Sequence, residues 1–154
     1  YYDEFSRSIL KIDLPVKKTL MNARLHFITT GHGGHEEGDE FTEKENVIYL
    51  NDQILTRFIP WRDDCASFRR FNPTSGVWTE KTTWKGEEIE ERIASSDYSR
   101  SNWCPGSDVV PLIIDLENLE EGIHQFEFAI PEAQEIDGDK INYWMVSAYI
   151  TYDE

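Results

Sequence analysis

The chain lacks the features that mark membrane-spanning and nucleic-acid-binding proteins. No apolar run approaches the roughly 20 residues that cross a bilayer, so no membrane span is predicted. Its 15 basic residues are outnumbered by 30 acidic ones, which gives a net charge of −15. A surface of that sign repels phosphate backbones and disfavours nucleic acid as a partner. The chain begins at Tyr1, without an initiating Met or a signal-peptide core, so we expect a processed product or an excised piece.

Cysteine is also scarce, since only Cys65 and Cys104 are present and no CxxC motif occurs. Two widely spaced cysteines suit one disulfide better than a metal or redox pair. A disulfide indicates an oxidising compartment, so we expect a secreted or periplasmic protein. Because both cysteines are expected to be paired, a thiol nucleophile is not predicted. No phosphate-binding motif or serine-triad order stands out, and no cofactor is predicted.

Aromatic residues are plentiful at 13% of the chain, and apolar residues alternate with polar ones in several short runs. Such alternation is typical of half-buried strands. Strands are predicted at residues 10–14, 23–30, 47–50, 53–59, 109–116, 123–130 and 141–152, with weaker candidates at 66–71 and 77–84. Pro15 is expected to end the first strand, and residues 85–94 to form one or two helical turns, because Ile89 and Ile93 lie four apart among charges. One antiparallel β-sandwich spanning residues 1–154 is therefore predicted.

Two polar loops carry the residues that invite a functional interpretation. Residues 95–106 hold Arg100, Trp103 and Cys104 and close on Pro-Gly. A loop so rich in recognition chemistry, fixed by a disulfide, is a candidate binding site. The alternative is a structural disulfide in a surface loop, covered by Trp103.

Residues 31–40 form the second predicted loop, with four glycines, His32, His35 and several acids. Imidazole and carboxylate groups bind divalent ions, but the spacing matches no strong motif and the EF-hand order is absent. We therefore expect a glycine-rich interdomain loop and predict no metal.

The motif GDEF at residues 38–41, the run Val47-Ile48-Tyr49-Leu50, Cys65 and the segment RSNWCPG at residues 100–106 resemble the C-terminal domain of peptide-N-glycosidase F. The resemblance covers roughly residues 20–150, and the Trp-Cys-Pro-Gly segment with its preceding Arg is the most specific part. The family hydrolyses the amide between asparagine and the first N-acetylglucosamine of N-linked glycans. Its fold is two side-by-side eight-stranded jelly rolls with the active site between them. The resemblance thus implies an antiparallel jelly-roll β-sandwich of about eight strands.

Carried over by position, the resemblance implies that Glu40 is the acid that this domain contributes to the active site, where it helps to hold the attacking water. Arg100 matches an arginine near the substrate, and Trp103 an aromatic of the sugar cleft. Cys65 and Cys104 match a family disulfide. Trp61, Arg62 and Asp64 precede Cys65, so we count them as candidate substrate-binding residues.

Simpler interpretations compete with these roles. Glu40 is one acid among several neighbours, and acidic runs are usually solvated faces. Arg100 is equally suited to a structural ion pair, for example with Asp97, and Trp103 to core packing.

Two departures from the family pattern stand out. The best-known member flanks its glutamate with a local disulfide, whereas Asp39 and Phe41 stand here, and residues 81–94 look like an insertion. The principal catalytic aspartate of the family lies in the first jelly roll, which this chain does not contain. We therefore expect an amidase domain that acts on N-linked glycoproteins when joined to its upstream jelly roll. The alternatives are a non-catalytic glycan- or protein-binding module and a purely structural sandwich.

Overall fold

The computed structural model describes residues 4–33, 38–71, 82–84, 87–89, 95–135 and 142–153. The strands are β1 (Leu10–Val16), β2 (Leu20–Gly33), β3 (Asn46–Leu50), β4 (Gln53–Phe58), β5 (Thr82–Trp84), β6 (Glu87–Ile89), β7 (Leu112–Leu119), β8 (Gly122–Ala129) and β9 (Asn142–Asp153). Three short 3-10 helices are η1 (Glu4–Ser6), η2 (Cys65–Phe71) and η3 (Ser95–Asp97). Within these described residues, no helix is long and apolar enough to cross a membrane.

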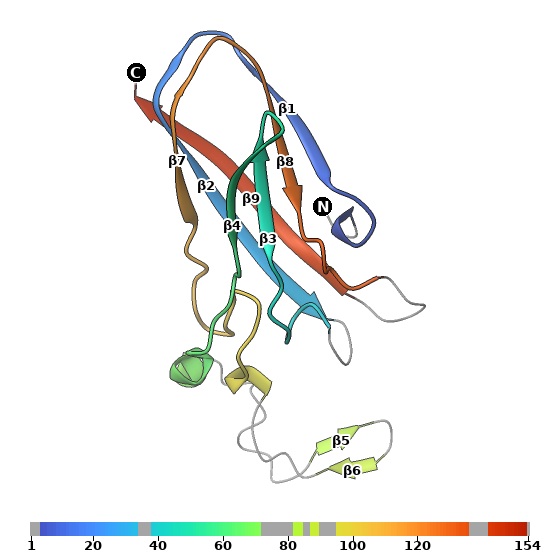
Figure 1. Ribbon diagram of the computed structural model, residues 1–154. Coiled ribbons are helices and arrows are strands. Elements are labelled where there is room, and N and C mark those ends of the chain that lie inside the picture. The colour runs from blue at the N-terminus through green and yellow to red at the C-terminus, as the bar shows by residue number, and fades with distance from the viewer. Residues whose placement is uncertain are drawn as a thin grey trace.

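Two antiparallel sheets form the body of the fold (Figure 1). One sheet has the order β1-β8-β3-β4 and the other the order β7-β2-β9, while β5 and β6 form a separate two-stranded ribbon. A jelly roll has eight strands, of which the second, seventh, fourth and fifth form one sheet, and the first, eighth, third and sixth form the other. The seven strands of the two sheets can be numbered two to eight in chain order, with β5 and β6 left out. Both observed strand orders then match this scheme. The predicted antiparallel jelly-roll sandwich is confirmed, with seven described strands in its two sheets.

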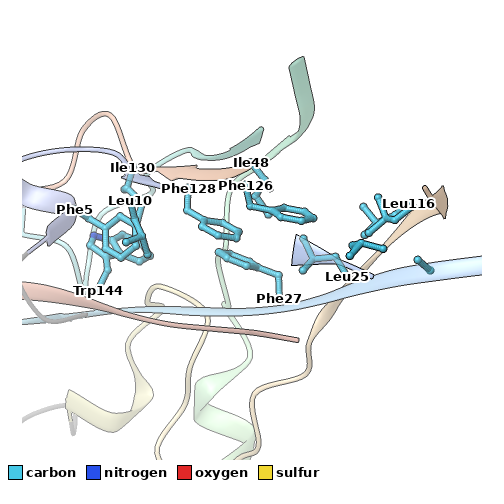
Figure 2. Close-up of a cluster of buried hydrophobic side chains, with 13 residues drawn as sticks. Phe5, Leu10, Leu25, Phe27, Ile48, Leu116, Phe126, Phe128, Ile130 and Trp144 are labelled. Carbon is cyan, nitrogen blue, oxygen red and sulfur yellow. The ribbon is translucent and has the colours of Figure 1, made fainter. Parts of the chain in front are cut away.

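The core lies between the two sheets and is rich in aromatic rings (Figure 2). On β2, Ala23, Leu25 and Phe27 are buried at alternate positions, as expected for side chains that point to one face of a strand. The ring of Phe27 stacks on Phe128 of the opposite sheet with centroids 5.2 Å apart. Burial of these apolar side chains holds the two sheets together.

Several strands have other bounds than the sequence predicted, and β7 is displaced, since it runs over Leu112–Leu119 and not over residues 109–116. β1 continues through Pro15 to Val16, because β1 is an edge strand that pairs only with β8. Proline is tolerated at an edge, where a missing N–H group breaks no second ladder. β2 continues through His32 to Gly33, where it pairs with β9. His32 therefore lies on a strand, and not in the loop predicted for residues 31–40.

Two weaker predictions were wrong where the structure describes the chain. Residues 66–71 are not a strand but lie in η2, which begins with a hydrogen bond from the Ser67 N–H to the Asp64 carbonyl of 3.0 Å. Glu87–Ile89, predicted as part of a helical turn, is strand β6 and pairs with β5. The helical prediction was based on the spacing of Ile89 and Ile93 alone. That spacing carries no information about the pairing of this segment with β5. Residues 77–81, 85–86 and 90–94 lie outside the described residues.

The two faces of β9 are both apolar, and burial distinguishes them. Trp144 is 1% exposed and belongs to the core, whereas Met145 is 56% exposed. The face that contains Tyr143, Met145, Ser147 and Tyr149 is thus the outer face of the sandwich.

Candidate functional site

Three segments meet at one end of the sandwich: the end of β2, the turn at residues 38–42, and the loop that follows η3. The Ser101 N–H donates to the Glu40 carbonyl over 2.9 Å, and the Ser101 hydroxyl donates to the Asp39 carbonyl over 2.6 Å. The Gly31 N–H donates to the Ser101 carbonyl over 3.3 Å. A Cβ on Gly31 would overlap the Asp39 carbonyl oxygen and lie 2.9 Å from the Ser101 Cβ, so this close approach requires glycine. These contacts hold Glu40 and Arg100 next to each other although they are distant in sequence.

Glu40 and Arg100 form an ion pair that is largely buried. The Arg100 Nη1 donates to Glu40 Oε1 over 2.8 Å, and the Gly33 N–H donates to Glu40 Oε2 over 2.9 Å. The Arg100 side chain is only 4% exposed and the Glu40 side chain 15%. Burial lowers the pKa of Arg100, and the nearby Glu40 charge opposes that effect. The carboxylate is therefore held in one orientation, and each oxygen keeps a lone pair for one further hydrogen bond, such as one from water.

Aromatic rings surround this ion pair. The Arg100 guanidinium lies 4.6 Å from the ring centroid of Trp103 and 5.0 Å from that of Phe41, which are cation–π distances. Tyr98 packs edge-on against Phe41 with centroids 6.2 Å apart. Phe41 and Tyr98 are 46% and 49% exposed, so the site offers aromatic surface to a ligand or to another domain.

His32 continues the aromatic cluster onto β2. Its ring lies between Trp103 and Tyr143, at centroid distances of 4.9 Å and 5.1 Å, and its Nε2 is 2.7 Å from the Thr30 hydroxyl. Burial, followed by the Arg100 charge, lowers the pKa of His32 from its ordinary value of 6.5. The neutral ring is therefore favoured beside Arg100.

The residue before Glu40 anchors the turn from the inside. Asp39 is fully buried, and its Oδ1 lies 3.0 Å from Lys44 Nζ and accepts the Gln134 N–H over 2.8 Å. The Asn142 side-chain amide donates to Asp39 Oδ2 over 3.4 Å. These partners offset the cost of burying the Asp39 carboxylate, and removal of any one of them would leave a buried charge without full compensation. Asp39 thus ties the Glu40 turn to the start of β9.

The disulfide predicted between Cys65 and Cys104 is present, and both residues are buried. It joins the start of η2 to the end of the loop that holds Arg100. A two-residue antiparallel bridge between Arg62 and Arg100 runs beside it, with both N–H to carbonyl distances at 3.0 Å. Backbone contacts therefore position Arg100 from both sides.

A family model described as "Peptide-N-glycosidase F, C terminal" matches residues 1–151. The chain belongs to the peptide-N-glycosidase F C-terminal family. No match was found among curated proteins.

Solved structures of similar fold support the assignment. PNGF-II, in a C2 crystal form, is 40% identical with a TM-score of 0.79, and the match covers 99% of this chain and 26% of that one. PNGase F, described as a glycosylasparaginase from Flavobacterium meningosepticum, is 16% identical with a TM-score of 0.63, over 97% of this chain and 45% of that one. The chain therefore spans about a quarter to a half of the length of these structures.

Within this peptide-N-glycosidase F C-terminal domain, the structure brings Glu40, Arg100 and Trp103 together. The ion pair considered for Arg100 exists, but its partner is Glu40. Asp97 instead pairs with Arg69 over 2.7 Å. The Trp103 indole donates to the Gly31 carbonyl over 2.9 Å, so this side chain both anchors the loop and covers Arg100.

Arg62 and Asp64 lie nearby but bind each other. Arg62 donates to both Asp64 oxygens, over 2.9 Å and 2.8 Å, and also to the Ser107 hydroxyl and the Asp108 carbonyl, each over 3.0 Å. This pairing raises the pKa of Arg62 and lowers that of Asp64. The pair therefore ties the segment before Cys65 to the segment after Cys104, and a substrate role for either residue stays a prediction.

Trp61 lines a groove of about 270 Å³ beside β4 and β7, together with Phe58, Asn102 and Pro111, and neither Glu40 nor Arg100 is among its lining residues. Asn102 connects the groove to Arg100, because its N–H donates to the Arg100 carbonyl over 2.8 Å. Its side chain donates to the Thr29 carbonyl of β2 over 2.9 Å. A substrate contact from Trp61 also stays a prediction.

Sequence reasoning missed the aromatic partners Phe41, Tyr98 and Tyr143. Phe41 follows the candidate acid directly, which was an available signal, but Tyr143 is brought in only by the pairing of β9 with β2. No group of three metal-ligating side chains occurs in the part of the chain that the structure describes. His35, Glu36 and Glu37 of the metal hypothesis lie outside that part.

Proposed function

We propose that this domain supplies Glu40 and Arg100 to the active site of a peptide-N-glycosidase F-like amidase, which an upstream domain of the same protein completes. The substrate is an N-linked glycoprotein. The observation that carries the proposal is the largely buried Glu40–Arg100 pair at the end of the sandwich, bordered by Trp103 and by the exposed ring of Phe41.

The chemistry fits the geometry of the pair. Hydrolysis adds water to the asparagine amide carbonyl, breaks the bond to nitrogen and leaves an aspartate and a glycosylamine. The water needs a carboxylate that accepts its hydrogen bond, and Glu40 keeps a lone pair on each oxygen after it binds Arg100 and Gly33. A second carboxylate must take the proton, because two carboxylates in different environments divide such tasks. That second group is assigned to the upstream domain.

The disulfide supports an extracytoplasmic location for this amidase. Cys65 and Cys104 are both buried and bonded to each other. Structural disulfides persist in oxidising compartments. We assign the protein to the periplasm or to the secreted fraction.

The test measures asparagine-to-aspartate conversion in an N-glycopeptide by mass spectrometry, in isotopically heavy water. Two proteins are compared: this chain alone and the chain with its native upstream region. Conversion is expected only with the longer protein, and Glu40→Gln should lower its rate by about a hundredfold or more. Glu121→Gln is the matched control, because Glu121 is exposed in the β7–β8 turn at the opposite end of the sandwich (Figure 1).

Other outcomes are equally informative. Conversion by this chain alone would contradict the shared active site. Absence of conversion in both proteins, with glycan binding that survives Glu40→Gln, would favour the binding module. Thermal unfolding of Glu40→Gln must be measured alongside, because removal of one partner from a buried pair also destabilises the fold.

A further inference from the structure

The end of β2 near the candidate site is bordered on one edge by a loop and not by a strand. Within the described residues, β7 pairs with β2 as far as Phe27 and Leu112, and Pro111 has no N–H group with which to extend the ladder. β9 continues along the other edge of β2 to Gly33. Beyond Phe27, the edge of β2 that faces away from β9 therefore needs other hydrogen-bond partners.

The loop after η3 supplies these partners. The Asn102 side-chain amide donates to the Thr29 carbonyl over 2.9 Å. The Gly31 N–H donates to the Ser101 carbonyl over 3.3 Å, and the Trp103 indole donates to the Gly31 carbonyl over 2.9 Å. Thr29 and Gly31 are alternate residues, which direct their backbone groups to the same edge of a strand. The loop thus takes the place that β7 leaves, with the Asn102 side chain in the role of a strand N–H group.

The backbone of Asn102 has a second property that the loop requires. Its φ angle is 62°, in the left-handed region, and its N–H donates to the Arg100 carbonyl over 2.8 Å. This tight turn brings Trp103 back over Arg100, with 4.6 Å between the ring centroid and the guanidinium. Asparagine tolerates left-handed angles and also carries an amide donor. Glycine meets only the first requirement, and an ionised aspartate has no donor.

The Glu40–Arg100 pair depends on the position of this loop. Arg100 reaches Glu40 Oε1 over 2.8 Å from a backbone that the loop fixes, and the Trp103 ring covers the guanidinium. Arg62 holds that backbone on the side of the disulfide, and Asn102 ties it to β2. A displacement of about 1 Å in an active site can lower a rate about a hundredfold. Loss of the Asn102 bond is therefore expected to reach the ion pair through the loop.

We propose that Asn102 is a positioning residue, whose side-chain amide and left-handed backbone hold Arg100 and Trp103 in place around the candidate site. Asn102 acts through these two side chains and not on the substrate itself. The consequence for activity rests on the proposed amidase function, whereas the effect on Arg100 and Trp103 is measurable in this chain alone. The experiment therefore has one readout for each.

The first measurement is NMR spectroscopy of this chain with Asn102→Gly, which removes the amide donor and tolerates the left-handed angle. Solvent exchange of the Trp103 indole N–H should accelerate at least about tenfold, because its bond to the Gly31 carbonyl is loosened. The pKa of His32, which burial and the Arg100 charge lower, should rise toward its ordinary value of 6.5. Both signals follow the positions of the two side chains directly.

Asn51→Gly is the matched control. Asn51 is also an asparagine with a left-handed φ angle, of 50°, but it lies in the turn between β3 and β4. Its replacement gives the unfolded chain the same extra freedom and should leave Trp103 and His32 as they are in the wild type. Asn102→Asp is a second variant of nearly the same shape. It should accelerate the Trp103 exchange as Asn102→Gly does, because a carboxylate cannot donate to the Thr29 carbonyl.

The second measurement is asparagine-to-aspartate conversion by the chain with its native upstream region. Asn102→Gly should lower kcat/KM at least about tenfold, mainly through kcat, because the chemistry depends on the geometry of the Glu40–Arg100 pair. Asn51→Gly should keep the wild-type values. Both variants are assayed at a temperature at which circular dichroism shows them to be fully folded.

The two readouts separate this proposal from the proposed function. Wild-type Trp103 exchange in both Asn102 variants would overturn the positioning role, and so would equal acceleration in Asn51→Gly. Altered NMR signals with an unchanged kcat/KM, in a protein whose wild type is active, would overturn it as well. The expected NMR changes together with an inactive wild type would support the positioning of Arg100 by Asn102 and would contradict the amidase function instead.

Discussion

At the scale of single residues, His32 reports on the electrostatics of the site. Burial and the Arg100 charge lower its pKa below 6.5. The unfolded chain takes up a proton near that value, while the folded protein resists it. The contribution of His32 to the free energy of unfolding should therefore be fully present above about pH 6.5. It should be lost as the pH drops toward the lower pKa of the folded state.

The measurement is urea unfolding at about pH 7.5 and about pH 5.5, on either side of the ordinary histidine pKa. Other groups also titrate in this range, so the comparison is between the wild type and His32→Gln. The loss of stability at the lower pH should be smaller in the variant. An NMR titration of the His32 ring checks the pKa directly, and a value above 6.5 would contradict the assignment.

At the scale of elements, the disulfide joins η2 to the loop that carries Arg100. Its removal by Cys65→Ser with Cys104→Ser should lower the free energy of unfolding by about 2–4 kcal/mol, because the unfolded chain gains the freedom of an open loop. Urea unfolding with and without a reductant measures this. The reductant should weaken the wild type to a similar extent and leave the double variant unchanged. Equal stability of the oxidised wild type and the double variant would be the contrary result.

At the scale of the whole molecule, the net charge of −15 is the dominant feature. Self-repulsion of that size destabilises the compact state and is screened by salt. Raising sodium chloride from about 0.01 M to about 0.15 M should raise the melting temperature by a few degrees. Choline chloride at the same ionic strength is the control, because general screening does not depend on the cation. A lower melting temperature in salt would mean that attractive pairs such as Arg57–Glu45 and Lys11–Glu127 outweigh the repulsion.

Several parts of the fold followed from local sequence signals. The hairpin of β3 and β4 follows from the two strands predicted at residues 47–50 and 53–59, which only Asn51 and Asp52 separate, and these two residues have positive φ angles of 50° and 64°. Asn and Asp tolerate a positive φ angle better than other non-glycine residues. The residue types at the turn therefore indicate it without reference to the rest of the fold. The alternation of β2 and the single disulfide were likewise predicted from neighbouring residues and from the count of cysteines.

The sequence by itself thus determined the all-β class, the disulfide and the location of the candidate loops, because each of these depends on short-range preferences or on a small number of possible pairings. Only the tertiary structure decided that Arg100 pairs with Glu40 and not with Asp97, that His32 lies on a strand, and that Trp144 and not Met145 faces the core. Each of these depends on strand register and on which apolar face finds a partner. The free energy of those choices comes from contacts between segments that are distant in the chain.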